Sequence, residues 1–281
     1  MFNIAGILVV NMPNRDVRWQ TFLEYADNWN WAFGCVPERL EAVVGVNLPG
    51  YGKAPWFTKR LSEKRRRSWG GKAGCILSHR KAIATARERG WDNVLIVEDD
   101  AYLTRESAEV WRTSLSQTAA SMEPGWAGLY LCTTTLFPPN RLISEAQGYR
   151  LIETTGALGT VAYIISRSAF EPLLQMLPTE QTIWPWVAAH KTIDRWLSRT
   201  LFGIGPVYSF APSLAGHRSV GMSDISMTAE DDCNLDFSLR DITLEGAQTS
   251  FARKKAARLL ICRAAKKVAG VRRTTKFLRG L

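Results

Sequence analysis

The alternation of two kinds of segment constrains the fold of this 281-residue chain more than any other feature. Short apolar runs rich in β-branched residues alternate with longer stretches of helical period, which predicts an α/β fold with a mostly parallel central sheet. We expect strands at Ile4–Val10, Leu40–Val46, Asn93–Val97, Gly128–Cys132, Thr160–Ile165 and Pro206–Phe210. We expect helices at Asp16–Asn28, Ala73–Glu88, Arg105–Ser121, Ser168–Met176 and Thr192–Leu201.

Three stretches between these elements lack a clear period, namely residues 47–72, 134–148 and 211–236. We expect loops there, the first being a long loop or an irregular helix. Long loops in compact domains are often functional. The first stretch carries the basic run Lys64–Arg67, which either steers an anionic substrate or forms a solvated face.

The net charge of +10 comes from the C-terminal end. Residues 253–281 contain eleven Lys and Arg and no Asp or Glu, whereas the preceding part of the chain holds 25 basic and 26 acidic residues. We therefore expect a nearly neutral domain at 1–236 and a basic extension, helix or tail, at 237–281. For residues 251–281 we expect an anionic membrane surface as partner. A disordered tail or a nucleic-acid contact is the less favoured alternative.

The five cysteines are odd in number, widely spaced and free of CxxC pairs, which indicates neither a disulfide framework nor a zinc site. We therefore expect a reducing, cytoplasmic location. The longest apolar stretch near the start, Ile4–Val10, is far shorter than a membrane span and lacks the features of a signal peptide. We expect no membrane-spanning segment, and the basic extension is compatible with a peripheral position on the inner membrane face.

Three adjacent acids, Glu98, Asp99 and Asp100, follow the apolar run Asn93–Val97. At the carboxyl end of a buried strand they would lie on the edge where open α/β sheets collect ligands. Strand alternation would place Glu98 and Asp100 on one side and Asp99 on the other. Because close negative charges repel, Mg²⁺ or Mn²⁺ would offset the cost and bridge the acids to a diphosphate. The alternative is a solvated turn whose acids cap the next helix.

These acids belong to a longer pattern. Gly74-Cys75-Ile76-Leu77-Ser78-His79 is followed about two dozen residues later by an apolar strand and the three acids, an arrangement that resembles glycosyltransferase family 25. That family includes bacterial lipooligosaccharide galactosyltransferases and collagen galactosyltransferases. Further similarities are Val10-Asn11 with Arg15 and Arg18, residues 159–174, Ile193-Asp194 and Ser223-Asp224-Ile225. The resemblance covers roughly residues 7–226 and departs from the family at Gly70-Gly71 and Lys72.

The resemblance implies that residues 1–236 form a GT-A type catalytic domain. It also implies a nucleoside-diphosphate sugar donor, such as a UDP-hexose, and transfer of the hexose, galactose or glucose, with inversion. By position Glu98 and Asp100 are expected to bind the metal ion, and His217 in a late loop is a candidate third ligand. The expected donor-binding residues are Asn11, Arg15, Arg18, Gly74, Ser78, His79 and Asp99. A helix start near Gly74 would present backbone N–H groups to the nucleotide.

An inverting transfer needs one carboxylate that takes the proton from the acceptor hydroxyl. Asp194 is the candidate because it opens a predicted helix, follows an apolar residue and matches the family pattern, with Asp224 in reserve. The alternative for Asp194 is an acid favoured only by the helix dipole. His79 could equally be a packed structural histidine, and the two arginines near the first strand could be surface residues.

Three functions fit the sequence. The first is glycosylation of a lipopolysaccharide, lipooligosaccharide or other surface-glycan precursor at the inner face of a membrane. The second is glycosylation of a protein or a modified nucleic acid, the tail binding another polyanion. The third is a non-catalytic nucleotide-sugar-binding relative, against which the intact acids argue. Trp184 and Trp186 are candidate sugar-stacking residues, although most of the eleven tryptophans are expected in the core.

Overall fold

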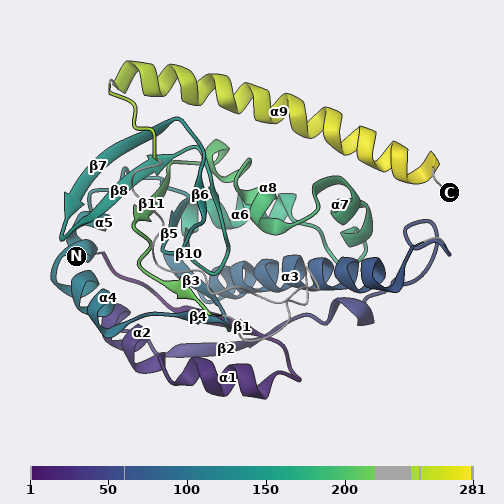
Figure 1. The fold of residues 1–281 in the computed structure, drawn as a ribbon, viewed down its shortest axis with the longest axis horizontal. Helices are drawn as coiled ribbons and strands as arrows, with labels where there is room; N and C mark the ends of the chain where they lie inside the picture. The colour runs from purple at the N-terminus through teal and green to yellow at the C-terminus, as the bar shows by residue number, and fades with distance from the viewer. Residues whose placement is uncertain (1, 60, 219–241, 247, 280–281) are drawn as a thin grey trace.

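A mixed eight-stranded sheet lies at the centre of the molecule, with helices on both faces (Figure 1). The structure is a computed structural model that describes residues 2–59, 61–218, 242–246 and 248–279, with side chains of the last helix described over 249–264. In sheet order the strands are β2 (Pro37–Glu41), β1 (Ile7–Asn11), β3 (Asn93–Glu98), β10 (Ala162–Ser166), β5 (Gly128–Tyr130), β11 (Val207–Ala211), β8 (Tyr149–Thr154) and β7 (Asn140–Ala146).

Two short strand pairs and a set of helices complete the described chain. The pairs are β4 (Ala101–Tyr102) with β12 (Gly216–His217), and β6 (Thr135–Leu136) with β9 (Ala157–Leu158). The helices are α1 (Asp16–Leu23), α2 (Ala26–Phe33), α3 (Glu63–Glu88), α4 (Arg105–Val110), α5 (Ser116–Ala119), α6 (Arg167–Met176), α7 (Ile183–His190), α8 (Ile193–Leu197) and α9 (Gln248–Arg279). The 3-10 turns are η1 (Gly45–Asn47) and η3 (Leu201–Gly203), and a π-helical segment, η2 (Trp111–Leu115), joins α4 to α5.

Both faces of the sheet are buried, which explains the nearly continuous apolar runs of its central strands. On β3, Val94 and Ile96 pack with α3, whereas Leu95 and Val97 face the opposite layer, which contains Trp29 of α2. Strand β1 pairs in parallel with β2 and β3, and β5 pairs in parallel with β11, while the other ladders are antiparallel. The predicted α/β fold around a large central sheet is confirmed.

The predicted long loop or irregular helix at 47–72 is a loop only as far as Ser62, and the helix predicted from Ala73 begins ten residues earlier. Helix α3 begins at Glu63, where the Ser62 hydroxyl caps it by accepting a hydrogen bond from the Arg65 N–H at 3.4 Å. Glycine inside a helix costs about 1 kcal/mol relative to alanine, so it needs a packing reason. A Cβ on Gly74 would lie 2.4 Å from the carbonyl oxygen of Val43. The glycines therefore let another backbone segment lie against the middle of α3.

The segment that lies against α3 was predicted as a strand, Leu40–Val46, but the chain leaves the sheet after Glu41. Its turn toward α3 is fixed by the Val43 N–H, which donates to the Ser78 hydroxyl at 2.8 Å. Gly45 follows at the closest approach to the helix, where an added Cβ would strike backbone atoms of α3. Contact with α3 thus overrides the local β propensity.

Residues 134–148 were predicted as a loop and instead contain β6 and the edge strand β7. Strand β7 has the sequence NRLISEA and is half-exposed, so it lacks the apolar run that marks the central strands. It pairs with β8 through a hairpin whose turn residues, Gln147 and Gly148, have φ of 52° and 77°. A polar edge strand of this kind carries the composition of a loop.

Helix α9 crosses the molecule beside α7 and β7 (Figure 1). Phe251 and Cys262 are buried on its inner side. The buried carboxylate of Glu153 on β8 joins the helix to the sheet. Lys255 Nζ of α9 donates to Glu153 Oε1 at 2.5 Å, and Arg141 of β7 pairs with Glu153 Oε2. The predicted basic extension is therefore a docked helix, although the boundary at 236 falls outside the described residues. In the described part of the chain, no helix is both long and apolar enough to cross a membrane.

Candidate functional site

The three acids lie at the carboxyl end of β3, beside the end of β1. The parallel register pairs Val10 with Glu98, so Asn11 stands next to the acidic turn. Asn11 is 1% exposed, and its Nδ2 donates to Asp99 Oδ2 at 2.6 Å. Parallel strands bring their carboxyl ends to one edge, which is how a short polar residue on one strand comes to hold an acid on the next.

Glu98 is held by two donors from other elements. The Thr160 hydroxyl donates to Glu98 Oε1 at 2.6 Å, and His79 Nε2 lies 3.4 Å from the same oxygen. His79 Nδ1 lies 2.8 Å from the Tyr163 hydroxyl, so the ring bridges Glu98 and Tyr163. Burial raises the pKa of Glu98, but the bonds from His79 and Thr160 outweigh it, and the net pKa is lowered. The carboxylate is thus stabilised in its charged form.

Asp99 and Asp100 both approach the guanidinium of Arg18, at 3.3 Å and 3.7 Å from its Nη1. The expected alternation of sides does not hold, because β3 ends at Glu98 and the next two residues turn. Burial raises the pKa of Asp99 even though Asn11 and Arg18 oppose it. Arg18 therefore offsets part of the repulsion among the three acids, and this repulsion was the reason for predicting a metal ion.

Asp100 is the most enclosed of the acids. The pairing of Gly216 and His217 with β4 brings His217 Nε2 to 3.3 Å from Asp100 Oδ2. Its other oxygen, Oδ1, is buried without a hydrogen-bond partner among the described residues. Burial raises the pKa of Asp100 to about 6, against the hydrogen bond from His217 and with help from the charge of Glu98. An unpartnered buried carboxylate oxygen of this kind suits a cation as ligand.

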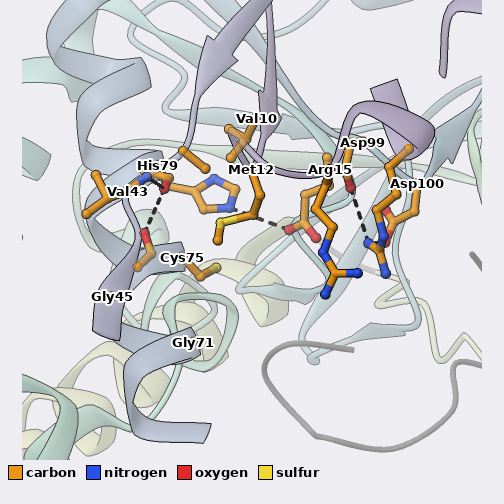
Figure 2. A pocket seen from close by; sticks show the side chains of 15 residues that line it. Val10, Met12, Arg15, Val43, Gly45, Gly71, Cys75, His79, Asp99 and Asp100 are labelled. Carbon is orange, nitrogen blue, oxygen red and sulfur yellow. Dashed lines mark hydrogen bonds and ion pairs between the residues drawn. The ribbon is translucent and has the colours of Figure 1, made fainter. Parts of the chain in front are cut away.

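An open cavity lies in front of the acids, with about 750 Å³ of empty space that includes open solvent (Figure 2). One wall carries Arg15 and Arg18 with Asp99 and Asp100, and the opposite wall is one face of α3. The α3 residues that line it recur at helical spacing: Gly71, Gly74, Cys75, Ser78 and His79. We call this space the first cavity.

Two predicted donor-binding residues have structural roles in this wall. The Ser78 hydroxyl donates to the Gly74 carbonyl at 2.7 Å and accepts from the Val43 N–H, so it fixes the turn after β2. Gly74 lies in the middle of α3, where its N–H belongs to the helix ladder, so the predicted helix terminus that would bind a nucleotide is not there. Asn11 likewise holds Asp99 and does not line the cavity.

A second cavity, with about 820 Å³ of open space, adjoins the first. It contains Asp194, in the first turn of α8, together with Lys72, Thr192 and Arg195. Cys75 and Glu98 line both cavities and so form the wall between them. Burial, and next the charges of Glu98 and Asp194, raise the pKa of Cys75, which keeps the thiol protonated. Asp194 and the acidic turn therefore face two adjoining spaces.

Other candidates lie elsewhere. The run Lys64–Arg67 forms the first turn of α3, lines neither cavity and is mostly exposed, with Arg67 paired to Glu63. Trp184 packs on Phe57 and donates to the Pro49 carbonyl at 2.7 Å, and Trp186 packs on Trp196. Both tryptophans belong to the core. The reserve base Asp224 lies outside the described residues.

Sequence reasoning missed several residues of the two cavities. Thr160 lies within the segment that resembled the family, but only its position opposite β3 shows that it holds Glu98. Lys72 was noted as a departure from the family pattern, and helical spacing from Cys75 could have placed it on the cavity side of α3. Thr192 and Arg195 flank the predicted base and could have been named with it.

The residues around Asp100 fit a divalent cation that arrives with its ligand. Over the described ranges, no group of three His, Cys, Asp or Glu side chains is arranged to hold an ion. Mg²⁺ is usually bound by one or two carboxylates together with substrate phosphates and water, without an all-protein cage. The buried Oδ1 of Asp100 has the chemistry of one such carboxylate ligand, and Arg15 and Arg18 line the same cavity.

Comparison with known proteins gives no family. No protein-family model and no curated protein matches the chain. Among solved structures it is similar to a glycosyltransferase involved in the glycosylation of the major capsid of PBCV-1, with 12% identity and a TM-score of 0.36 over 69% of this chain and 72% of that one. It is also similar to A197 from STIV, with 11% identity and a TM-score of 0.37 over 83% of this chain and 96% of that one.

Proposed function

We propose that the chain is a glycosyltransferase that moves a hexose from a nucleoside-diphosphate sugar to an acceptor hydroxyl with inversion. The observation that carries the proposal is the pair of cavities that meet at Glu98 and Cys75. A displacement reaction needs donor and acceptor in adjoining sites with the reacting atoms close together. In this proposal residues 1–236 form a GT-A type catalytic domain.

The first cavity suits the donor. Arg15 and Arg18 offer guanidinium groups that pair bidentately with phosphate oxygens. Asp100, at the same wall, would hold Mn²⁺ or Mg²⁺, which when bound offsets the charge that develops on the leaving diphosphate. Asp99 competes with the phosphates for Arg18, so donor binding would draw the guanidinium away from that carboxylate.

The second cavity suits the acceptor. Asp194 would accept the proton of the acceptor hydroxyl as its oxygen forms a bond to the anomeric carbon. The bond from that carbon to the diphosphate oxygen breaks at the same time, and the nucleoside diphosphate leaves with the electron pair. Glu98 stands in the shared wall, fixed by His79 and Thr160, where it can orient the sugar between the two sites.

The test is turnover with a panel of nucleotide sugars, beginning with UDP-galactose and UDP-glucose, with and without Mn²⁺. We expect metal-dependent release of UDP, slow with water alone and faster with a hexoside acceptor. Asp100→Ala should abolish the metal-dependent part while circular dichroism shows an intact fold, and Asp16→Ala, on the exposed side of α1, is the matched control. Binding of UDP-sugars without any turnover would favour a non-catalytic relative.

The outer side of α9 favours a location at an anionic membrane surface. Leu260 and Ile261 are each 66% exposed there, and Arg253 and Arg263 are exposed near them. The inner side takes up Lys255 and Arg258, which removes two cations from the outer face. Exposed apolar residues flanked by cations are typical of helices that lie in a membrane interface. The acceptor class that fits such a location is a lipopolysaccharide, lipooligosaccharide or other surface-glycan precursor.

Flotation with vesicles of phosphatidylglycerol and phosphatidylcholine tests this location. We expect binding to the anionic vesicles, to which each cation near the surface contributes about 1 kcal/mol. High salt should abolish this binding because it screens the attraction. The double variant Leu260→Glu with Ile261→Glu should reduce it several-fold, whereas Ala256→Glu with Ala257→Glu controls for charge alone. Equal binding to neutral vesicles, or capture of nucleic acid in preference to lipid, would contradict the assignment.

A further inference from the structure

Two cations line the second cavity and form no ion pair with its two acids, Glu98 and Asp194. Lys72 is half-buried on α3, and Arg195 is exposed on α8. Within the part of the chain that the structure describes, neither side chain forms an ion pair, and Asp194 in the same cavity stays apart from both. Burial, and next the charges of Lys191 and Arg195, lower the pKa of Lys72. The charged form of Lys72 is therefore held in the cavity wall at a cost in free energy.

A hydroxyl and a strained turn accompany these cations. Thr192 lines the cavity, and its Oγ1 is buried without a hydrogen-bond partner among the described residues. Lys191, just before it, has φ 71° and ψ −75°, and the Thr192 N–H donates to the His190 carbonyl at 3.1 Å, which is a γ-turn of the rare, strained form. Strain of this kind persists where the surroundings fix it and concentrates at ligand sites. The turn sets the position of Thr192 and of the α8 residues behind it.

We propose that the second cavity takes an acceptor bearing an anionic group, a phosphate or a carboxylate, which Lys72, Arg195 and the Thr192 hydroxyl bind beside the reacting hydroxyl. This rests on the proposed function, because it assigns the acceptor class of the same site. An anion there would pair two cations that the folded chain leaves unpaired and would satisfy a buried hydroxyl in one step. Asp194 would remain next to the attacking oxygen.

The experiment compares three probes by calorimetry in the presence of saturating UDP, which fills the first cavity. The probes are a methyl hexoside, the matching hexose 6-phosphate and the matching hexuronic acid. We expect at least one anionic probe to bind roughly tenfold or more tightly than the methyl hexoside, since charge-assisted hydrogen bonds contribute about that factor. The stronger of the two anionic probes identifies phosphate or carboxylate as the recognised group.

Substitutions locate the effect. Lys72→Met and Arg195→Gln should each reduce the ratio of anionic to neutral affinity at least several-fold, whereas Lys64→Met, a cation outside both cavities, should leave the ratio as it is. UDP affinity, measured separately for each variant without a probe, shows that the variant is folded. Equal affinity for neutral and anionic probes overturns the inference, as does a ratio that Lys72→Met and Arg195→Gln do not change.

Failure of this inference can be told apart from failure of the proposed function. If the wild-type chain releases UDP from UDP-hexose but the probes bind equally, only the acceptor class is wrong. If no nucleotide sugar is bound or turned over, the proposed function fails, and the probe affinities measured without UDP still show whether the second cavity selects anions.

Discussion

The two cavities differ in how their charges are balanced. In the first, each acid already has protein partners: Glu98 has His79 and Thr160, and Asp99 has Asn11 and Arg18. In the second, Lys72 and Arg195 have no carboxylate within ion-pair contact among the described residues. The acids of the first cavity are therefore held by protein partners before any ligand binds. The two cations of the second cavity would gain a partner only when an anion binds.

This difference indicates how the charged groups of each cavity affect the free energy of the folded chain. Partners that fix charged groups in advance lower the reorganisation needed during a reaction. An unpaired and half-buried cation such as Lys72 raises the free energy of the folded chain until an anion binds it. A substitution in the first cavity should therefore destabilise the fold, and one in the second should mainly change ligand binding.

The largest effect is expected from Asp194→Asn, which keeps the shape of the second cavity but removes the proposed base. General base catalysis contributes about 10²–10⁴-fold, so the transfer rate should fall by that factor. UDP affinity, measured by calorimetry, should stay at the wild-type level because Asp194 lies outside the first cavity. A variant that retains full transfer would show that another group takes the proton.

Arg18→Gln and Lys72→Met test the comparison directly. Loss of Arg18 leaves Asp99 and Asp100 close together and buried, so the free energy of unfolding should fall by about 3–5 kcal/mol. Loss of the charge on Lys72 should leave it unchanged or raise it slightly. Urea denaturation measures both, with Arg39→Gln, which breaks an exposed pair, expected to cost about 0.5 kcal/mol or less. Equal losses in the first two variants would remove the distinction between the cavities.

Gly74→Ala tests whether the backbone contact between α3 and Val43 shapes the wall of the first cavity. The added Cβ would lie 2.4 Å from the Val43 carbonyl oxygen, so the turn after β2 must move, at a cost of about 1–3 kcal/mol. Gly70→Ala is the matched control, because its Cβ would meet a side-chain atom, Val46 Cγ1, at 2.8 Å, and the nearest backbone atom outside α3, Val46 N, only at 3.4 Å. Thermal unfolding should show the larger decrease for Gly74→Ala. The reverse order would mean that the contact with α3 does not shape this wall.

A smaller effect concerns pH. Because the pKa of Asp100 is raised to about 6 from 3.8, the folded chain binds more protons than the unfolded chain between these values. The contribution of Asp100 to stability therefore falls as pH rises through this window and stays low above it. Asp100→Asn lacks this titration, so its melting temperature relative to wild type should be a few degrees higher at about pH 7.5 than at about pH 4.5. A constant difference between the two pH values would show that this carboxyl does not carry the raised pKa.

The central strands could be predicted because the signals that mark them lie within the strands themselves. Residues 93–97 and 160–165 are apolar and buried on both faces, so composition alone marks them, and three acids after the first run mark its exposed end. The position of Asp194 at the start of α8 followed from the same kind of local signal.

The remainder depends on contacts between distant segments. The start of α3 was misplaced because glycine normally ends helices, whereas Gly74 is needed for contact with the backbone at Val43. Strand β7 was missed because an edge strand needs no apolar run. The pairing of His217 with Asp100 depends on a two-residue strand more than a hundred residues away from its partner in sequence, which no spacing rule reveals.

The clamp at Glu153 ties the outermost helix to the interior. A buried carboxylate held by Lys255 from α9 and by Arg141 from the sheet makes separation of the two costly, so α9 cannot swing away as a loose arm. Helix α9 also packs on α7, which continues through the strained turn at Lys191 into the helix that carries Asp194. The helix on the outside of the molecule is thus connected, through α7 and this turn, to Thr192, Asp194 and Arg195 in the wall of the second cavity.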